Sequence, residues 1–343
     1  MAETLDAGTL NPADEMPPTQ VAVIGCGVIG SAWAARFRRA GVAVRAFDPS
    51  PNAARILDEV EANAATAWAE LGLPPVTPGD LTVCASVAEA VDGAQLVQES
   101  VPERLEIKAS TLAAIEEAAS TEAVIASSTS GFRPTVLAEG LAHPERLIVA
   151  HPFNPVYLLP LVEVVGGEAT TAAVLEQAQG WYRSVGMRPL HVRTEIDAFI
   201  ADRLLEAVWR EALWLVNDGV ATTAEIDDAI TYGFGLRWAQ MGLFDTYRVA
   251  GGEGGMRQFI AQFGECLSWP WTKLMDTPEL TDDLIDAVAT QSDDQSGHFT
   301  IRELERARDR NLAAILRALE ANEWGAGATL ARQRAAVTTR LGS

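Results

Sequence analysis

The chain has 343 residues, a formal net charge of −21 and 48% hydrophobic residues. This length exceeds the usual size of one compact domain, so we expect two soluble globular domains, each with its own core. Clustered lysine and arginine are needed to bind nucleic acid or an anionic membrane, so the acidic charge disfavours both partners. The charge favours solubility and could weakly attract a cationic substrate.

The N-terminal segment, MAETLDAGTLNPADEMPPTQ, is acidic and contains proline. No run of about 18 apolar residues follows it or occurs elsewhere, so neither a signal peptide nor a membrane span is indicated. The cytoplasm is therefore the expected location. The three cysteines, Cys26, Cys84 and Cys266, are widely spaced and form no CxxC or CxxH group, so we expect buried packing residues and neither a disulfide framework nor a metal site.

The first half of the chain shows the pattern of an α/β fold. After a flexible arm at 1–18, a β-branched run at 21–25, a helical pattern at 31–41 and a strand pattern at 42–48 predict a βαβ unit. Helical segments separate most of the later strand patterns, so residues 19–194 are predicted to form a doubly wound, largely parallel, Rossmann-type domain. The later strands are predicted at 81–85, 94–100, 123–127, 146–151, 161–166 and 188–192.

The second half is different, because strand patterns disappear after about residue 195. Helical periodicity dominates at 198–219, 222–235 and 301–324, and Thr222 or Thr223 can cap the second of these helices. Residues 195–324 are therefore predicted to form an all-helical C-terminal domain. The final segment, 325–343, has no clear apolar stripe and is predicted to be a loose tail.

A glycine-rich turn, GCGVIG at 25–30, lies between the first predicted strand and helix, and Asp48 ends the next strand. This arrangement favours a dinucleotide over an empty glycine turn: the glycines allow a tight turn, approach of a pyrophosphate and close packing of helix on strand. Asp48 would accept hydrogen bonds from ribose hydroxyls and repel a 2′-phosphate, which favours NAD, although Arg45 and Arg55 weaken this preference a little. The predicted cofactor-binding residues of this region are Gly25, Gly27, Val28, Ile29, Gly30 and Asp48.

Three runs in the same order and spacing resemble the 3-hydroxyacyl-CoA dehydrogenase family: IASSTSG at 125–131, AHPFNP at 150–155 and LVEVVGG at 161–167. The resemblance spans about residues 20–320 and implies an NAD-dependent enzyme that forms a homodimer. It implies that His151 is the general base, that Glu163 orients its imidazole, and that Ser130 holds the reacting oxygen. Oxidation of a secondary alcohol needs a hydride acceptor and a base with a pKa near neutrality, which histidine can supply. Read alone, a strand that ends in histidine could also be plain architecture.

Three further residues take their predicted roles from the same resemblance. Glu103 and Lys108 match family positions near the nicotinamide, although a solvated helix start is an alternative reading. In AFIADR at 198–203, Asp202 stands where the family usually has Asn, and an ionised Asp cannot donate a hydrogen bond to a carbonyl oxygen. We hypothesise that Asp202 orients His151 or lies near a cationic group of the substrate.

The run at 232–247 is similar to family members that act on free acids, and residues 241–276 closely resemble those that oxidise carnitine. This resemblance implies that L-carnitine is oxidised to 3-dehydrocarnitine. Arg237 suits a free carboxylate, because a guanidinium binds both oxygens, although a surface ion pair is as good a reading. A trimethylammonium group is bound best by aromatic faces, and we predict contacts from Tyr232, Phe234 and Trp238. Core packing is the alternative for each of the aromatic residues here, which are Tyr232, Phe234, Trp238, Phe244, Tyr247, Trp269 and Trp271.

Two other functions stay open at this point. The chain could oxidise another free 3-hydroxy acid or a short 3-hydroxyacyl-CoA, or it could be a non-catalytic dinucleotide-binding structural module. The presence of Ser130, His151 and Glu163 together favours an enzyme.

Overall fold

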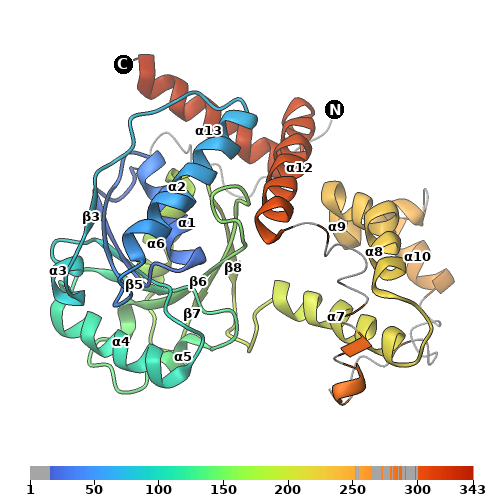
Figure 1. The fold of residues 1–343 in the computed structure, drawn as a ribbon, viewed down its shortest axis with the longest axis horizontal. Helices are drawn as coiled ribbons and strands as arrows, with labels where there is room; N and C mark the ends of the chain where they lie inside the picture. The colour runs from blue at the N-terminus through green and yellow to red at the C-terminus, as the bar shows by residue number, and fades with distance from the viewer. Residues whose placement is uncertain are drawn as a thin grey trace. The chain divides into compact units, whose positions relative to one another are not determined.

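A computed structural model describes residues 16–251, 253, 255–263, 272, 279, 281–284, 286–287, 290, 298 and 300–342. The chain forms two compact units (Figure 1): residues up to Ile200 together with those from Asp309 onward, and Ala201–Arg308. Among the described residues, no helix combines the length and apolar character needed to cross a membrane. Cys266, Trp269, Trp271 and most of the predicted N-terminal arm lie outside the described residues.

The first unit is built around an eight-stranded sheet with the order β3-β2-β1-β4-β5-β6-β7-β8. Neighbouring strands are parallel except for the antiparallel pair β6 and β7. All eight predicted strands are confirmed, with ends that differ by at most two residues. Their bounds are β1 Gln20–Ile24, β2 Ala43–Phe47, β3 Leu81–Val83, β4 Leu96–Glu99, β5 Val124–Ser127, β6 Leu147–Pro152, β7 Leu161–Gly166 and β8 Arg188–Val192.

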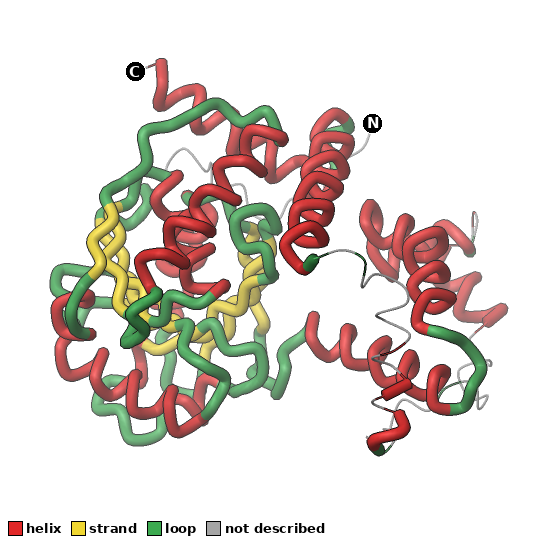
Figure 2. Tube along the Cα trace, in the orientation of Figure 1, coloured by secondary structure: helices red, strands yellow, loops and turns green. Residues whose placement is uncertain are grey.

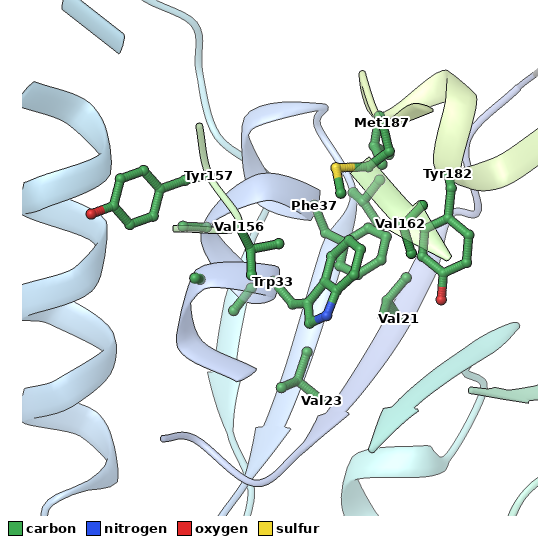
Figure 3. Close-up of a cluster of buried hydrophobic side chains, with 14 of the residues drawn as sticks. Val21, Val23, Trp33, Phe37, Val156, Tyr157, Val162, Tyr182 and Met187 are labelled. Atoms are coloured by element: carbon green, nitrogen blue, oxygen red, sulfur yellow. The ribbon is translucent and has the colours of Figure 1, made fainter. Parts of the chain in front are cut away.

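Helices cover both faces of this sheet (Figure 2), and every residue of its central strands β4 and β5 is buried. On one face, Trp33 and Phe37 of α1 stack at 5.4 Å and Tyr182 of α6 lies 5.3 Å from Trp33 (Figure 3). A second buried cluster contains residues of α3 and α4 on the opposite face. The helices of this region are α1 Val28–Arg39, α2 Ala53–Glu70, α3 Val87–Val91, α4 Leu105–Ala118, α5 Pro134–Leu137 and α6 Ala172–Ser184.

The prediction of a loose tail at 325–343 is wrong, because α13 Gly325–Gly342 is a helix that packs on α12 Ile301–Ala321 and on the first unit. A Cβ added to Gly327 would lie 2.0 Å from the carbonyl carbon of Leu319, so the two helices approach closely because this residue is glycine. Arg334 pairs with Glu320 and donates to the Leu71 carbonyl at 3.0 Å. Leu330 is the buried apolar side chain that α13 adds to the core cluster, and one such residue makes no broad apolar stripe in the sequence. The observed second unit accordingly ends at Arg308 and not at residue 324.

The described part of the second unit is helical, with α7 Ala201–Asn217, α8 Thr223–Ala229, a π-helical segment at Ile230–Phe234, α9 Gly235–Ala250 and α10 Gly255–Phe263. Thr222 caps α8 as predicted, because its hydroxyl accepts from the Glu225 amide and Glu225 accepts from the Thr222 amide. The single helix predicted at 222–235 is instead interrupted. Gly233 has non-helical backbone angles within the π-helical segment.

Candidate active site

The turn between β1 and α1 has the shape that a bound dinucleotide requires. Gly25 has a φ of +93°, which favours glycine. A Cβ at Gly30 would lie 1.8 Å from the Gly25 carbonyl oxygen, whereas a Cβ at Gly27 would meet nothing within 4 Å. The open space at Gly27 therefore lies at the amino end of α1, which no side chain caps, and the first N–H groups of a helix attract anions.

Asp48 follows β2 and holds this turn in place. Its Oδ2 accepts from the Cys26 amide at 2.7 Å and its Oδ1 accepts from the Ser50 amide at 2.8 Å. Burial, with a smaller contribution from the charge of Asp48, raises the pKa of the Cys26 thiol to about 12. The sequence predicts a ribose contact for Asp48 but misses this second role of its carboxylate.

The strand order reverses between β1 and β4, and dinucleotides bind across the carboxyl ends of the strands at such a point. Val28 begins α1 with 57% of its surface exposed, so an apolar side chain borders the glycine turn. Ile29, the other apolar residue of the motif, is half-buried beside it. The residues of this turn therefore fit a dinucleotide, with open space at Gly27 beside the uncapped amino end of α1.

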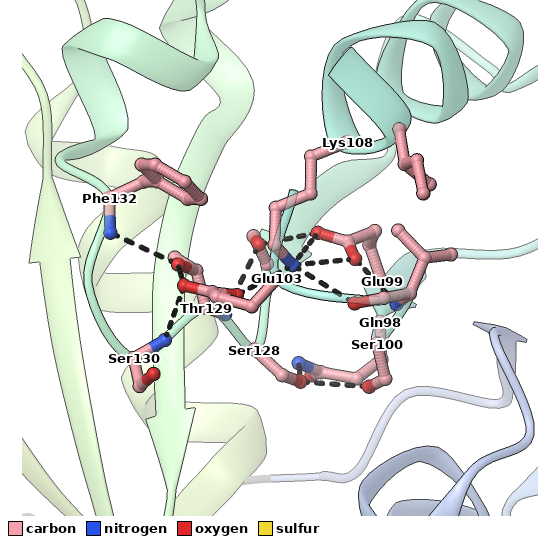
Figure 4. Close-up of polar contacts among 12 residues, drawn as sticks. Gln98, Glu99, Ser100, Glu103, Lys108, Ser128, Thr129, Ser130 and Phe132 are labelled. Carbon is pink, nitrogen blue, oxygen red and sulfur yellow. Dashed lines mark hydrogen bonds and ion pairs between the residues drawn. The ribbon is translucent and has the colours of Figure 1, made fainter. Parts of the chain in front are cut away.

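Beyond β4, Glu99 and Lys108 form a buried ion pair with exposed side-chain fractions of 0% and 1% (Figure 4). Lys108 Nζ lies 3.0 Å and 3.2 Å from the two Glu99 oxygens, donates to the Val101 carbonyl at 3.3 Å, and lies 3.3 Å from Glu103 Oε2. The alternative reading of Lys108 as part of a solvated helix start is wrong. Its burial favours an action on the cofactor region through Glu103, whose side chain is 41% exposed.

Glu103 in turn holds the turn that follows β5. Its Oε1 accepts from the Thr129 hydroxyl and from the backbone amides of Ser130 and Gly131, the two amides lying at 3.2 Å each. Ser130 is half-buried in this turn. The side chain that is predicted to hold the reacting oxygen therefore sits on a backbone fixed by a carboxylate.

His151 and Glu163 are directly opposite each other in the antiparallel register of β6 and β7. His151 Nδ1 lies 2.9 Å from Glu163 Oε2, and Glu163 Oε1 accepts from the Ile200 amide at 3.0 Å. The Glu163 side chain is 0% exposed, and the rings of Phe153 and Phe199 lie 5.0 Å and 5.8 Å from the imidazole. A neutral imidazole that donates from Nδ1 to a carboxylate carries its lone pair on Nε2, which is the arrangement of a general base.

The first unit brings these groups to one edge of the sheet. Gly25, Asp48 and Glu99 stand at the carboxyl ends of three parallel strands, and Ser130 and His151 stand at the carboxyl ends of the neighbouring strands β5 and β6. Because β7 runs antiparallel, Glu163 near its start lies at the same edge. Carboxyl edges of parallel strands are the usual position of ligand sites in such sheets.

The remaining predicted residues belong to the second unit. Asp202 lies in the first turn of α7, Tyr232 and Phe234 lie in the π-helical segment, and Arg237 and Trp238 lie in the first turn of α9. The rings of Phe234 and Trp238 are 4.5 Å apart and tilted by 55°. This pair is the one contact that the structure shows among the described aromatic residues predicted to bind substrate.

Sequence reasoning missed Glu99, Thr129 and the Ile200 amide. Glu99 carried a signal, because a charged residue at the end of a predicted strand, nine positions before one of two lysines in the chain, suggests a buried pair. No signal in the sequence marks a backbone amide such as that of Ile200 as a partner of Glu163.

Comparison with known proteins places this site in a family. Residues 20–196 match the sequence model of the 3-hydroxyacyl-CoA dehydrogenase NAD binding domain, and residues 199–292 match that of the 3-hydroxyacyl-CoA dehydrogenase C-terminal domain. The chain belongs to the 3-hydroxyacyl-CoA dehydrogenase family. The cofactor of the domain at 20–196 is NAD, which the glycine turn and Asp48 fit.

Two relatives and one solved structure illustrate the similarity. The chain is 62% identical over 91% of its length to a protein of Agrobacterium fabrum named L-carnitine dehydrogenase/betainyl-CoA thioesterase, of which it covers 64%, less than two thirds. It is 55% identical over 90% of its length to L-carnitine dehydrogenase of Mesorhizobium japonicum, of which it covers 86%. The crystal structure of 5-formyl-3-hydroxy-2-methylpyridine 4-carboxylic acid 5-dehydrogenase, an NAD+ dependent dismutase, matches 89% of this chain and 99% of its own at a TM-score of 0.74 and 28% identity.

Proposed function

We propose that this chain oxidises L-carnitine to 3-dehydrocarnitine with NAD. The observation that carries the proposal is the 55% identity, over most of both chains, to a relative named L-carnitine dehydrogenase. The buried His151 and Glu163 pair supports it, because it has the composition and geometry of a general base with an orienting carboxylate.

In the proposed mechanism, Nε2 of His151 removes the proton of the substrate hydroxyl. Glu163 keeps the proton of the imidazole on Nδ1 and stabilises the positive charge that the ring gains. The Ser130 hydroxyl holds the reacting oxygen, on the turn that Glu103 fixes. The glycine turn and Asp48 would hold NAD, which would supply the hydride acceptor for the alcohol carbon. The aromatic rings beside His151 exclude water and so strengthen the interaction with Glu163.

Residues of the second unit are proposed to select carnitine. Arg237, exposed in α9, would bind the carboxylate through both oxygens. Phe234 and Trp238 would bind the trimethylammonium group, because a cation is attracted to the face of an aromatic ring. The two rings are tilted by 55° relative to each other, and 38% of Trp238 is exposed. Tyr232, with 82% of its surface exposed, would complete the contact. Asp202 would orient His151 or lie near the ammonium group.

The L enantiomer is the proposed substrate for a stereochemical reason. L-carnitine carries the label R and the L-3-hydroxyacyl substrates of the family carry the label S, but only because nitrogen outranks the carboxyl arm in naming. The two hydroxyl arrangements in space are the same. The same base and the same hydride acceptor can therefore serve L-carnitine.

The test is spectrophotometric. NADH should form when the protein is mixed with NAD and L-carnitine at alkaline pH, and D-carnitine should give a much lower rate. Silence with L-carnitine but oxidation of NADH by acetoacetyl-CoA would replace this proposal with a 3-hydroxyacyl-CoA substrate. Tight binding of NAD without turnover of any 3-hydroxy acid would indicate a structural module.

We also propose a homodimer formed through the second unit. Leu204, Leu205 and Trp209 of α7 expose 58%, 58% and 53% of their surfaces, and Phe244 and Val249 of α9 expose 75% and 66%. Apolar side chains in such number usually mark an interface. Light scattering should give twice the mass of the chain, and Trp209→Glu should reduce this mass; a monomeric wild type would refute the dimer.

Because the reaction would use the soluble NAD pool, we propose a cytoplasmic location, which cell fractionation can test.

A further inference from the structure

A relay of charged side chains links the core of the sheet to the turn that carries Ser130 (Figure 4). The relay consists of Glu99, Lys108 and Glu103. The three N–H donors of Lys108 have as neighbours both oxygens of Glu99, the Val101 carbonyl and Glu103 Oε2. Lys108 is therefore shared between a fully buried carboxylate and a partly exposed one.

Burial of the charged pair Glu99 and Lys108 carries a cost in the free energy of folding. Removing a carboxylate and an ammonium group from water costs several kcal/mol per ion, and apolar side chains of similar volume stabilise such a site equally well or better. Neither Glu99 nor Lys108 reaches solvent. Fold stability alone therefore gives no reason for charges at these two positions.

Both carboxylates of the relay act on the same short segment, Ser127–Gly131. The Ser127 hydroxyl donates to Glu99 Oε2, at the start of the segment. Thr129, Ser130 and Gly131 all donate to Glu103 Oε1. Between them, the Ser128 hydroxyl accepts from Gln98 at 2.8 Å and lies 2.9 Å from the Ser100 hydroxyl. The relay and its neighbours thus hold every residue of the segment from the side of β4.

We propose that Glu99 is a positioning residue for Ser130. Glu99 holds Lys108, Lys108 holds one oxygen of Glu103, and the other oxygen of Glu103 is thereby aimed at the Ser130 turn. Without Glu99, Lys108 pairs with Glu103 alone and draws its carboxylate away from the turn. The consequence for catalysis rests on the proposed function, in which Ser130 holds the reacting oxygen.

The first test measures the turn directly and needs neither cofactor nor substrate. Hydrogen exchange followed by mass spectrometry should show that the amides of Ser130 and Gly131 exchange about tenfold faster in Glu99→Gln and in Glu103→Gln, since a charged acceptor binds about twice as strongly as a neutral one. Glu106→Gln is the matched control, because Glu106 is an exposed acid on α4, the helix that carries Lys108. Unchanged exchange in both relay variants would overturn the proposal.

The second test separates positioning from general stability. In Glu99→Gln and Glu103→Gln, kcat/KM for L-carnitine should fall about tenfold. Glu103→Gln should show this loss with little change in melting temperature, because the Glu103 side chain is 41% exposed. Glu99→Gln should also lower the melting temperature, because it removes one partner of a buried ion pair. The double variant should lose no more than Glu103→Gln alone, because both residues act through one contact. Additive losses, or faster exchange spread over all of β4 and α4, would show a merely structural role.

Two further variants keep the test decisive if Glu99→Gln fails to fold. Thr129→Val and Ser127→Ala each remove one contact between the relay and the segment, and neither leaves a charge unpaired. Each also removes an acceptor of backbone amides, those of Gly131 and Phe132 for Thr129 and that of Thr129 for Ser127, so exchange is read at Ser130, whose amide donates to neither hydroxyl. Faster exchange at Ser130 in both supports the proposal, and unchanged exchange in both overturns it. The wild-type assay with L-carnitine is read separately: no turnover there refutes the proposed function, whereas normal turnover with unaffected relay variants refutes the relay.

Discussion

Replacement of Glu163 by glutamine isolates the charge of the buried pair. Glutamine has nearly the same volume, and its amide oxygen can still accept from the Ile200 amide, which now lies 3.0 Å from Glu163 Oε1. The fold around His151 should therefore survive. The variant loses the negative charge that lies 2.9 Å from Nδ1 of the imidazole. This charge stabilises the ring when it takes up a proton.

The expected magnitude follows from the value of that contact. A hydrogen bond to a charged group contributes about 1.5–3 kcal/mol, more than one between neutral groups. The contribution belongs mostly to the transition state, because the imidazole becomes charged only as it accepts the proton. At about 1.36 kcal/mol for each factor of ten in rate, kcat/KM should fall roughly 10-fold to 150-fold.

The assay is steady-state formation of NADH from NAD and L-carnitine, with the dissociation constant of NAD measured separately by calorimetry. Glu176→Gln, an exposed acid of α6, is the matched control and should behave as wild type. Glu163→Asp keeps the charge at a longer distance, so its kcat/KM should lie between the values of wild type and Glu163→Gln. The reasoning is refuted if kcat/KM of Glu163→Gln falls by less than about threefold, or if NAD affinity falls by the same factor as activity.

Three further outcomes concern the cofactor region. Gly27→Ala should leave the melting temperature unchanged but weaken NAD binding more than tenfold, since its Cβ enters the open space where a pyrophosphate would lie. Gly30→Ala should instead destabilise the fold, because its Cβ would lie 1.8 Å from a carbonyl oxygen. Equal melting temperatures of the two variants would contradict this difference. Asp48→Asn should weaken NAD binding and reduce the ratio of the dissociation constant of NADP to that of NAD, both measured by calorimetry. An unchanged ratio of these dissociation constants would exclude a ribose contact of Asp48. Because the pKa of Cys26 is raised to about 12, its thiol stays protonated at pH 9, and iodoacetamide should label it slowly in the folded protein and fast in the unfolded chain. Peptide mass spectrometry measures the two labelling rates, and equal rates would be inconsistent with the burial of Cys26.

The sequence predicted the sheet well because most of its strands are short, rich in β-branched residues and separated by helical patterns, and their length distinguishes them from helices. It predicted the glycine turn because a tight backbone tolerates few residue types, as the 1.8 Å clearance at Gly30 shows. The helix at 325–342 escaped prediction for the opposite reason. Its contacts involve Gly327, Arg334 and the buried Leu330, and together these give no periodic apolar signal.

The pairing of His151 with Glu163 could be expected from the resemblance, but the reason for the pairing is the register of two strands. Antiparallel pairing of β6 and β7 follows from a reversal of the chain at 153–160, where Asn154 and Pro155 favour a turn but do not by themselves fix the register of the two strands. The reversal is held by distant parts of the chain: Arg36 donates to the Val156 carbonyl at 2.7 Å and Trp68 donates to the Tyr157 carbonyl at 2.9 Å. Contacts between residues so far apart in the sequence cannot be read from spacing.

The Arg36 contact has a consequence for how the site is organised. Arg36 belongs to α1, the helix that begins at the glycine turn, and it also bonds the carbonyl of Gly186 at 3.3 Å. The same rigid helix therefore presents its amino end to the cofactor and, through Arg36, fixes the loop that returns the chain from His151 to Glu163. Burial lowers the pKa of Arg36 to about 9, with a smaller contribution from Arg39, so its charge is costly and is offset by carbonyl oxygens. α1 thus contributes both to the cofactor turn and to the loop between His151 and Glu163, while the residues proposed to bind the carboxylate and the trimethylammonium group lie apart in the sequence at 232–238.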